Sequence, residues 1–60
     1  MDDEARRQLR HDLRSPLVVI AGFAQLLQSE RELELSDRRD YAERILRAAR
    51  ELEGLIDERL

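Results

Sequence analysis

The chain has 60 residues, with 11 basic and 14 acidic side chains, a formal net charge of −3 and no cysteine. A folded chain of this length removes only about 60% of its unfolded surface from water, so a lone monomer is expected to be marginally stable. The lack of cysteine excludes a disulfide framework and a cysteine-based metal site. Arginines interspersed with acids leave no basic face for nucleic acid.

Ala, Glu, Leu and Arg dominate the composition, and aromatic residues make up only 3% of it. This composition is typical of long helices and coiled coils, in which burial between helices replaces a compact aromatic core. The apolar run between Ser15 and Ser29 is too short to cross a bilayer, and the acidic start at residues 1–4 is unlike a secretory signal. We therefore expect residues 1–60 to be a single all-helical domain that self-associates. We also expect it to make no membrane contact and to be a fragment of a larger protein.

The first half of the chain predicts one long helix over about residues 4–28. Its apolar residues recur at spacings of four and three, which is the pattern of a helix with one buried face. These positions form an apolar seam of Leu9, Leu13, Pro16, Ile20, Phe23 and Leu27. A proline inside a helix donates no amide hydrogen bond, and its ring presses on the carbonyl of Asp12, so we expect the helix to bend at Pro16.

The second half predicts another helix over about residues 37–59, after a charged loop over about residues 29–35. Ser36 is the expected N-cap, and Asp37 suits the positive start of the helix. One apolar row, the second seam, comprises Tyr41, Ile45, Ala48, Leu52 and Leu55, and an adjoining row comprises Ala42, Leu46, Ala49, Ile56 and Leu60. Two rows indicate more than one neighbour, so we expect antiparallel helical hairpins that homodimerise into a four-helix bundle. Disorder is the competing interpretation of so charged a chain, and the regular spacing argues against it.

His11 is the only histidine in the chain. It lies about 160° from the seam on a helical wheel, so its imidazole is expected to project into solvent. Asp12 can accept a hydrogen bond from one ring nitrogen, which leaves the other nitrogen with a free lone pair for attack on phosphorus. Ser15, Val18 and Gly22 follow on the same side and form a strip that a partner could occupy. The alternative interpretation is a solvated histidine and carboxylate, an ordinary surface valine and a glycine that permits close packing.

The segment His11-Asp12-Leu13-Arg14-Ser15-Pro16-Leu17 resembles the H-box of sensor histidine kinases, which usually reads His-Glu/Asp-Leu-Arg-Thr/Asn-Pro-Leu. Residues 20–27 resemble the family's segment after the box, and residues 41–60 resemble its second helix. The resemblance therefore extends over nearly the whole chain. It implies the dimerisation and histidine-phosphotransfer domain of such a kinase.

By this resemblance His11 is the phosphoacceptor, and Asp12 is the acid/base residue that orients the imidazole. Arg14 is expected to contact phosphoryl oxygens, and Val18 and Gly22 are expected to bind the partner. Ser15 occupies the position at which family members often use Thr or Asn to dephosphorylate their response regulator. Serine keeps a hydroxyl but departs from the usual residue, so phosphatase activity is left open.

The resemblance also implies that the phosphoryl group comes from ATP, with Mg²⁺, bound to a separate catalytic domain. It then passes to an aspartate in the receiver domain of a response regulator. The sequence has no glycine-rich loop to hold a nucleotide, so we expect this fragment to be inactive without that catalytic domain.

A single histidine without cysteine gives too few ligands for a metal site. The domain is expected to be cytoplasmic, in a parent protein that is either membrane-anchored or soluble. The alternative function, from the class of interaction modules, is a helical dimerisation hairpin without phosphotransfer, in which His11 is inert.

Overall fold

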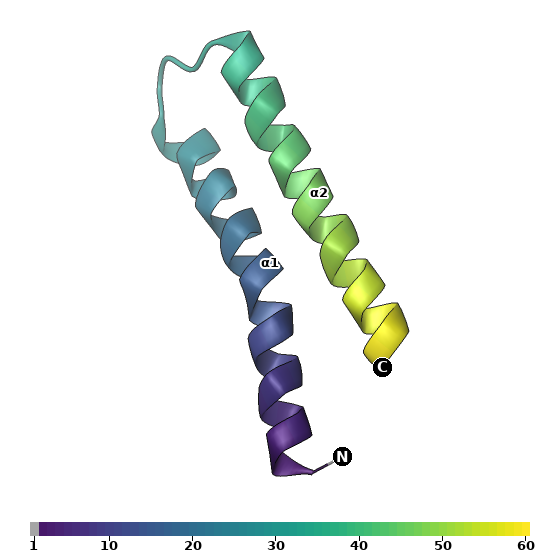
Figure 1. The fold of residues 1–60 in the computed structure, drawn as a ribbon. Coiled ribbons are helices and arrows are strands. Elements are labelled where there is room, and N and C mark those ends of the chain that lie inside the picture. Colours follow the sequence, from purple (N-terminus) through teal and green to yellow (C-terminus); the bar gives the residue numbers. More distant parts are fainter. Residues whose placement is uncertain (1) are drawn as a thin grey trace.

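Two antiparallel helices joined by a short loop form the fold in the computed structural model, which describes residues 2–60 (Figure 1). Helix α1 covers Asp3–Ser29 and helix α2 covers Leu35–Arg59, and residues 2–60 contain no strand. The hairpin is long and thin, with principal extents of 47 × 18 × 9 Å. The start of α1 and the end of α2 lie at the end of the hairpin away from the loop (Figure 1). The predicted all-α helical hairpin is confirmed.

Helix α1 begins one residue before and ends one residue after the predicted range of 4–28. Its N-cap is Asp2, whose Oδ1 accepts a hydrogen bond of 2.7 Å from the amide of Ala5. Asp3 and Glu4 place two further acidic side chains in the first turn, where the helix dipole favours negative charge. The acidic start of the sequence therefore stabilises the beginning of α1.

The prediction that Ser36 caps the second helix was wrong. Helix α2 begins at Leu35, so Ser36 lies inside its first turn, and the N-cap residue Glu34 makes no side-chain capping hydrogen bond. The first turn closes instead through a backbone hydrogen bond of 2.9 Å from the amide of Arg38 to the carbonyl of Glu34. Asp37 lies in the first turn, as predicted.

The predicted apolar seams of the two helices pack against each other. Every predicted seam residue is buried or half-buried, namely Leu9, Leu13, Pro16, Ile20, Phe23 and Leu27 on α1 and Tyr41, Ile45, Ala48, Leu52 and Leu55 on α2. Leu9 and Ala48 are buried, and Pro16 is the most completely buried large side chain. Removing this apolar area from water, at about 25 cal/mol per Å², is what holds the helices together.

The adjoining row of α2, the outer row, stays exposed in the single hairpin. It consists of Ala42, Leu46, Ala49, Ile56 and Leu60, all of them exposed. Leu46 is 50% exposed, and Leu17 on α1 is 49% exposed. The hairpin therefore covers one of the two apolar rows on α2 and leaves the other in contact with solvent.

Neither helix of residues 2–60 has both the length and the apolar character that spanning a bilayer requires.

An aromatic pair links the two helices between His11 and the loop. The ring centroids of Phe23 and Tyr41 are 5.3 Å apart at an interplanar angle of 46°, a tilted arrangement common for aromatic pairs. Arg44 lies over Phe23 with Cζ 5.6 Å from the ring centroid, and its Nε donates to Asp40 at 3.0 Å. These contacts join α1 to α2 near the loop.

Candidate functional site

His11 lies on the side of α1 that faces away from α2, and its side chain is 81% exposed. The predicted projection of the imidazole into solvent is therefore observed. Nδ1 lies 3.5 Å from Oδ1 of Asp12, while Nε2 has no hydrogen-bond partner within residues 2–60. With its hydrogen on Nδ1, the ring directs that hydrogen toward the carboxylate and leaves the Nε2 lone pair open to solvent.

Asp12 is half-buried and interacts with three side chains. Its Oδ1 accepts a hydrogen bond of 3.1 Å from Nε2 of Gln8, and the same oxygen faces His11. Its Oδ2 accepts a charge-assisted hydrogen bond from a guanidinium nitrogen of Arg59, in the last turn of α2. The carboxylate is thus tied to both helices.

The guanidinium of Arg59 is the main reason that the pKa of Asp12 lies below its ordinary value of 3.8. Hydrogen bonds from His11 and Gln8 lower this pKa further, and desolvation of the carboxylate opposes them. Each of these donors favours the charged form. Asp12 is therefore a carboxylate at neutral pH and can accept a hydrogen bond from the imidazole.

A shallow hollow of about 390 Å³ opens beside the imidazole, lined by His11, Arg14, Ser15, Val18 and Val19. Two members of the predicted partner strip, Ser15 and Val18, therefore line one depression together with His11 and Arg14. The hollow combines a nucleophilic ring, a guanidinium and a hydroxyl with two apolar side chains. A phosphoryl group could be contacted by the polar part while a protein partner covers the valines.

Gly22 lies in a neighbouring hollow of about 200 Å³, lined with Val18, Val19, Phe23 and Leu26. A Cβ atom added at Gly22 would meet no atom within 4 Å, so the hairpin does not need a glycine there for close packing. The close-packing interpretation of Gly22 is thus not supported within one hairpin. Instead, the missing side chain leaves the surface beside Val18 open.

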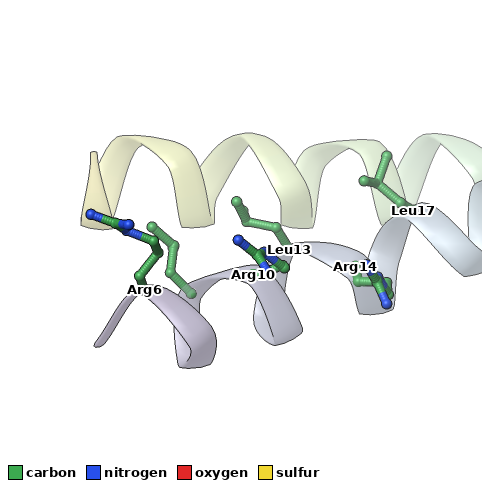
Figure 2. A pocket seen from close by; sticks show the side chains of 6 residues that line it. Arg6, Arg10, Leu13, Arg14 and Leu17 are labelled. Atoms are coloured by element: carbon green, nitrogen blue, oxygen red, sulfur yellow. The ribbon is translucent and has the colours of Figure 1, made fainter. Parts of the chain in front are cut away.

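Arg14 also lines a second groove on α1, of about 390 Å³, shown in Figure 2. Arg6, Arg10 and Arg14 follow one another at intervals of one helical turn, and Leu9, Leu13 and Leu17 complete the lining. Arg14 therefore stands between this arginine-rich groove and the hollow that holds His11. No group of three or more metal-ligating side chains is assembled within residues 2–60.

Gln8 and Arg59 belong to the site but were not predicted from the sequence. Gln8 precedes Asp12 by four residues, so the helical period could have paired them. Arg59 follows Leu55 by four residues and thus continues the second seam, where a charged side chain needs a partner. The position of Arg59 in the seam could therefore have indicated that it has a partner on α1. Which residue that partner is depends on the alignment of the two helices.

Comparison with known proteins identifies the family of this site. Residues 4–60 match the model of the "His Kinase A (phospho-acceptor) domain" family. The chain belongs to this family. It is also 44% identical over 50 residues to the sensor protein VanSC of Enterococcus gallinarum, an alignment that covers 83% of this chain and 14% of that protein. The His Kinase A domain described here thus spans a small part of the length of this relative, and no solved structure matches it.

Proposed function

We propose that this His Kinase A domain is the phosphoacceptor and dimerisation domain of a two-component sensor histidine kinase. His11 accepts a phosphoryl group from ATP, held with Mg²⁺ by a separate catalytic domain, and passes it to an aspartate in a response regulator's receiver domain. The observation that carries this proposal is the exposed imidazole with Nδ1 facing Asp12 and Nε2 free. The domain is proposed to be cytoplasmic, in a parent protein that is anchored to a membrane or soluble.

The chemistry needs one lone pair and one proton acceptor. Nε2 of His11 attacks the γ-phosphorus, the bond from phosphorus to the leaving oxygen breaks, and ADP departs with that electron pair. The ring gains positive charge as the new bond forms, and Asp12 stabilises it by accepting the hydrogen bond from Nδ1. An aspartate of the regulator then attacks the same phosphorus, and the imidazole leaves.

The residues around His11 are proposed to bind the phosphoryl group and the response regulator. Arg14, in the same hollow, contacts phosphoryl oxygens, since a guanidinium presents several donors to phosphate. Val18, with the open surface at Gly22, binds the regulator. Ser15 can orient water for the reverse hydrolysis of the phosphorylated regulator, which would give the domain phosphatase activity.

Homodimerisation into a four-helix bundle is the second part of the proposal. The outer row of α2 and Leu17 of α1 are exposed in one hairpin. By the helical period, and because the helices are antiparallel, both flank the seam on the same side of the hairpin. A second hairpin packed on this side would bury both of them. Burial there would supply the apolar area that a lone 60-residue chain lacks.

Incubation of the chain with Mg²⁺-ATP and a separately purified histidine-kinase catalytic domain tests phosphoacceptance. We expect an acid-labile, base-stable phosphoryl label on the chain. His11→Gln should abolish the label, because the chain has no other histidine. Asp12→Asn should slow labelling by about 100-fold, the usual scale for losing a general base.

Circular dichroism and mass measurements on the same variants serve as controls. His11→Gln should keep the helix content and the dimer mass, because His11 lies outside both the seam and the exposed apolar surface proposed for the dimer. A folded, dimeric wild-type chain that takes no label from several catalytic domains would contradict phosphoacceptance. That result would favour the plain dimerisation module.

A further inference from the structure

The contact between Arg59 and Asp12 is the one ion pair within residues 2–60 that joins the two helices. The partners are 47 positions apart in sequence, and their side chains are 32% and 27% exposed. The other arginine pairs lie within one helix at spacings of three or four and are at least half exposed. Since partial burial reduces screening by water and salt, the cross-helix pair is the strongest of the set.

This pair competes with His11 for the Asp12 carboxylate. Ordinary N–H···O hydrogen bonds measure about 2.7–3.2 Å. The contact from Nδ1 of His11, at 3.5 Å, is longer than that, whereas Gln8 donates to the same oxygen at 3.1 Å. Arg59 engages the other oxygen from the side of α2. The carboxylate is therefore bound firmly toward α2 and only loosely to the imidazole.

We propose that Arg59 is a positioning residue that holds Asp12 toward α2 and thereby limits the hydrogen bond between Asp12 and Nδ1 of His11. This proposal rests on the proposed phosphotransfer function, because it concerns how readily Nε2 of His11 attacks phosphorus. The two contacts use different oxygens of one short side chain, so the pull of the guanidinium on Oδ2 keeps Oδ1 at 3.5 Å from Nδ1. The last turn of α2 thus controls the reactivity of a residue on α1.

The charge of Arg59 acts in the same direction as its geometry. The imidazole becomes positive as the bond from Nε2 to phosphorus forms, and Asp12 is the anion that compensates this charge. A guanidinium already bound to Asp12 neutralises part of that anion. Removing the guanidinium frees the carboxylate to rotate toward Nδ1 and leaves its full charge beside the ring. Both effects favour the Nδ1–H form of the imidazole, in which Nε2 is the nucleophile.

Two measurements on the folded chain test this role, and neither needs a kinase domain. The first is the fraction of the Nδ1–H tautomer of His11, read from the ring ¹⁵N chemical shifts. The second is the rate of phosphorylation by phosphoramidate, in which Nε2 attacks phosphorus, the bond to the amide nitrogen breaks and ammonia leaves. Since His11 is the only histidine, all imidazole label reports on one site.

Arg59→Gln should increase the Nδ1–H fraction and speed labelling by roughly two- to fivefold, the change expected for a partly exposed ion pair. Arg59→Lys keeps the charge on a single donor group and should give a smaller increase in both. Arg47→Gln is the matched control, because among residues 2–60 the ion-pair partner of Arg47 is Glu43, on its own helix at 3.8 Å. This control should match the wild-type chain in both measurements.

Combining substitutions separates positioning from general stability. In an Asp12→Asn background, Arg59→Gln should change neither the tautomer fraction nor the labelling rate. If Arg59→Gln keeps its full helix content but is labelled more slowly than wild type or at the same rate, the proposal is overturned. It is also overturned if Arg59→Gln still increases the labelling rate in the Asp12→Asn background. If Arg59→Gln unfolds the chain, the comparison of Arg59→Lys with wild type decides in the same way. A chain that phosphoramidate labels as expected but that takes no label from ATP would refute the proposed function alone.

Discussion

The ionisation of Asp12 links the stability of this hairpin to the chemistry of His11. The same carboxylate faces Nδ1 of the imidazole and joins α1 to α2 through Arg59. A proton on Asp12 would weaken the bond to Arg59 and remove the anion that stabilises a positive imidazole. One titration therefore affects both the fold and the site.

We expect acid to destabilise the hairpin through Asp12. Its pKa in the folded chain is lowered, chiefly by Arg59, from an ordinary value of 3.8 that also describes the unfolded chain. The unfolded state therefore takes up the proton first, and the contribution of Asp12 is complete above pH 3.8 and is lost as pH falls through the lowered pKa. Thermal melts followed by circular dichroism between about pH 2 and pH 6 measure this loss.

Asp12→Asn is the control for this pH dependence. The variant should be less stable than the wild type above the transition and should show a weaker decrease in melting temperature below it. Equal pH profiles for the two proteins would show that the pair with Arg59 contributes no stability.

The sequence predicted the exposure of His11 and its pairing with Asp12 but not the contact between Arg59 and Asp12. The helical wheel fixes which way a side chain leaves its own helix, so the imidazole could be placed from spacing alone. The partner of Arg59 depends on how far α2 is shifted along α1. Loop length and packing set that shift, and neither is encoded in the spacing of one helix.

The apolar pattern predicts which face of each helix is buried more reliably than it predicts where the helix begins. Every predicted seam residue is buried or half-buried, because the helical period alone decides which side chains share a face. The start of α2 was placed two residues too late, because Ser36 is a good capping residue but Leu35 already has helical geometry. Caps and helix propensities differ by about 1 kcal/mol or less, so they decide boundaries less reliably than burial decides faces.

Pro16 offers a test of the predicted bend in α1. Pro16→Ala restores an amide donor to the carbonyl of Asp12 and removes a helix penalty of about 3 kcal/mol. It also removes about two buried methylenes worth roughly 1.6 kcal/mol, and it frees the unfolded chain by up to about 1 kcal/mol. We expect a small net stabilisation and a straighter α1, measured by thermal melts and by residual dipolar couplings.

Gln25→Ala, at an exposed position of the same helix, reports the effect of an added alanine without loss of a proline. If the bend serves the site, Pro16→Ala should accept phosphoryl groups more slowly than wild type although it melts no lower. A lower melting temperature with unchanged couplings would show that Pro16 acts only through its packing.

For the whole molecule, the shortage of buried residues is the dominant fact. Residues 2–60 bury Leu9, Pro16 and Ala48, while eight large apolar side chains stay at least 36% exposed. A single narrow seam between two helices leaves little free energy after the conformational entropy of the chain is lost. The hairpin is therefore expected to be stable mainly in association with a second copy, and its melting temperature should rise with protein concentration.

A pair of matched substitutions separates the proposed dimer surface from the proposed regulator surface. Leu46 is 50% exposed on the outer row of α2, and Val18 is 62% exposed beside His11. Both side chains are accessible in one hairpin, so a glutamate at either position should not disturb the packing of α1 against α2. In the four-helix bundle Leu46→Glu would bury a charge, so we expect this variant to dissociate the dimer. Light scattering should then give a lower mass, and the melting temperature should no longer depend on protein concentration. Val18→Glu should keep the dimer and slow phosphoryl transfer to the regulator, and dissociation by Val18→Glu alone would place the dimer interface on the His11 side instead.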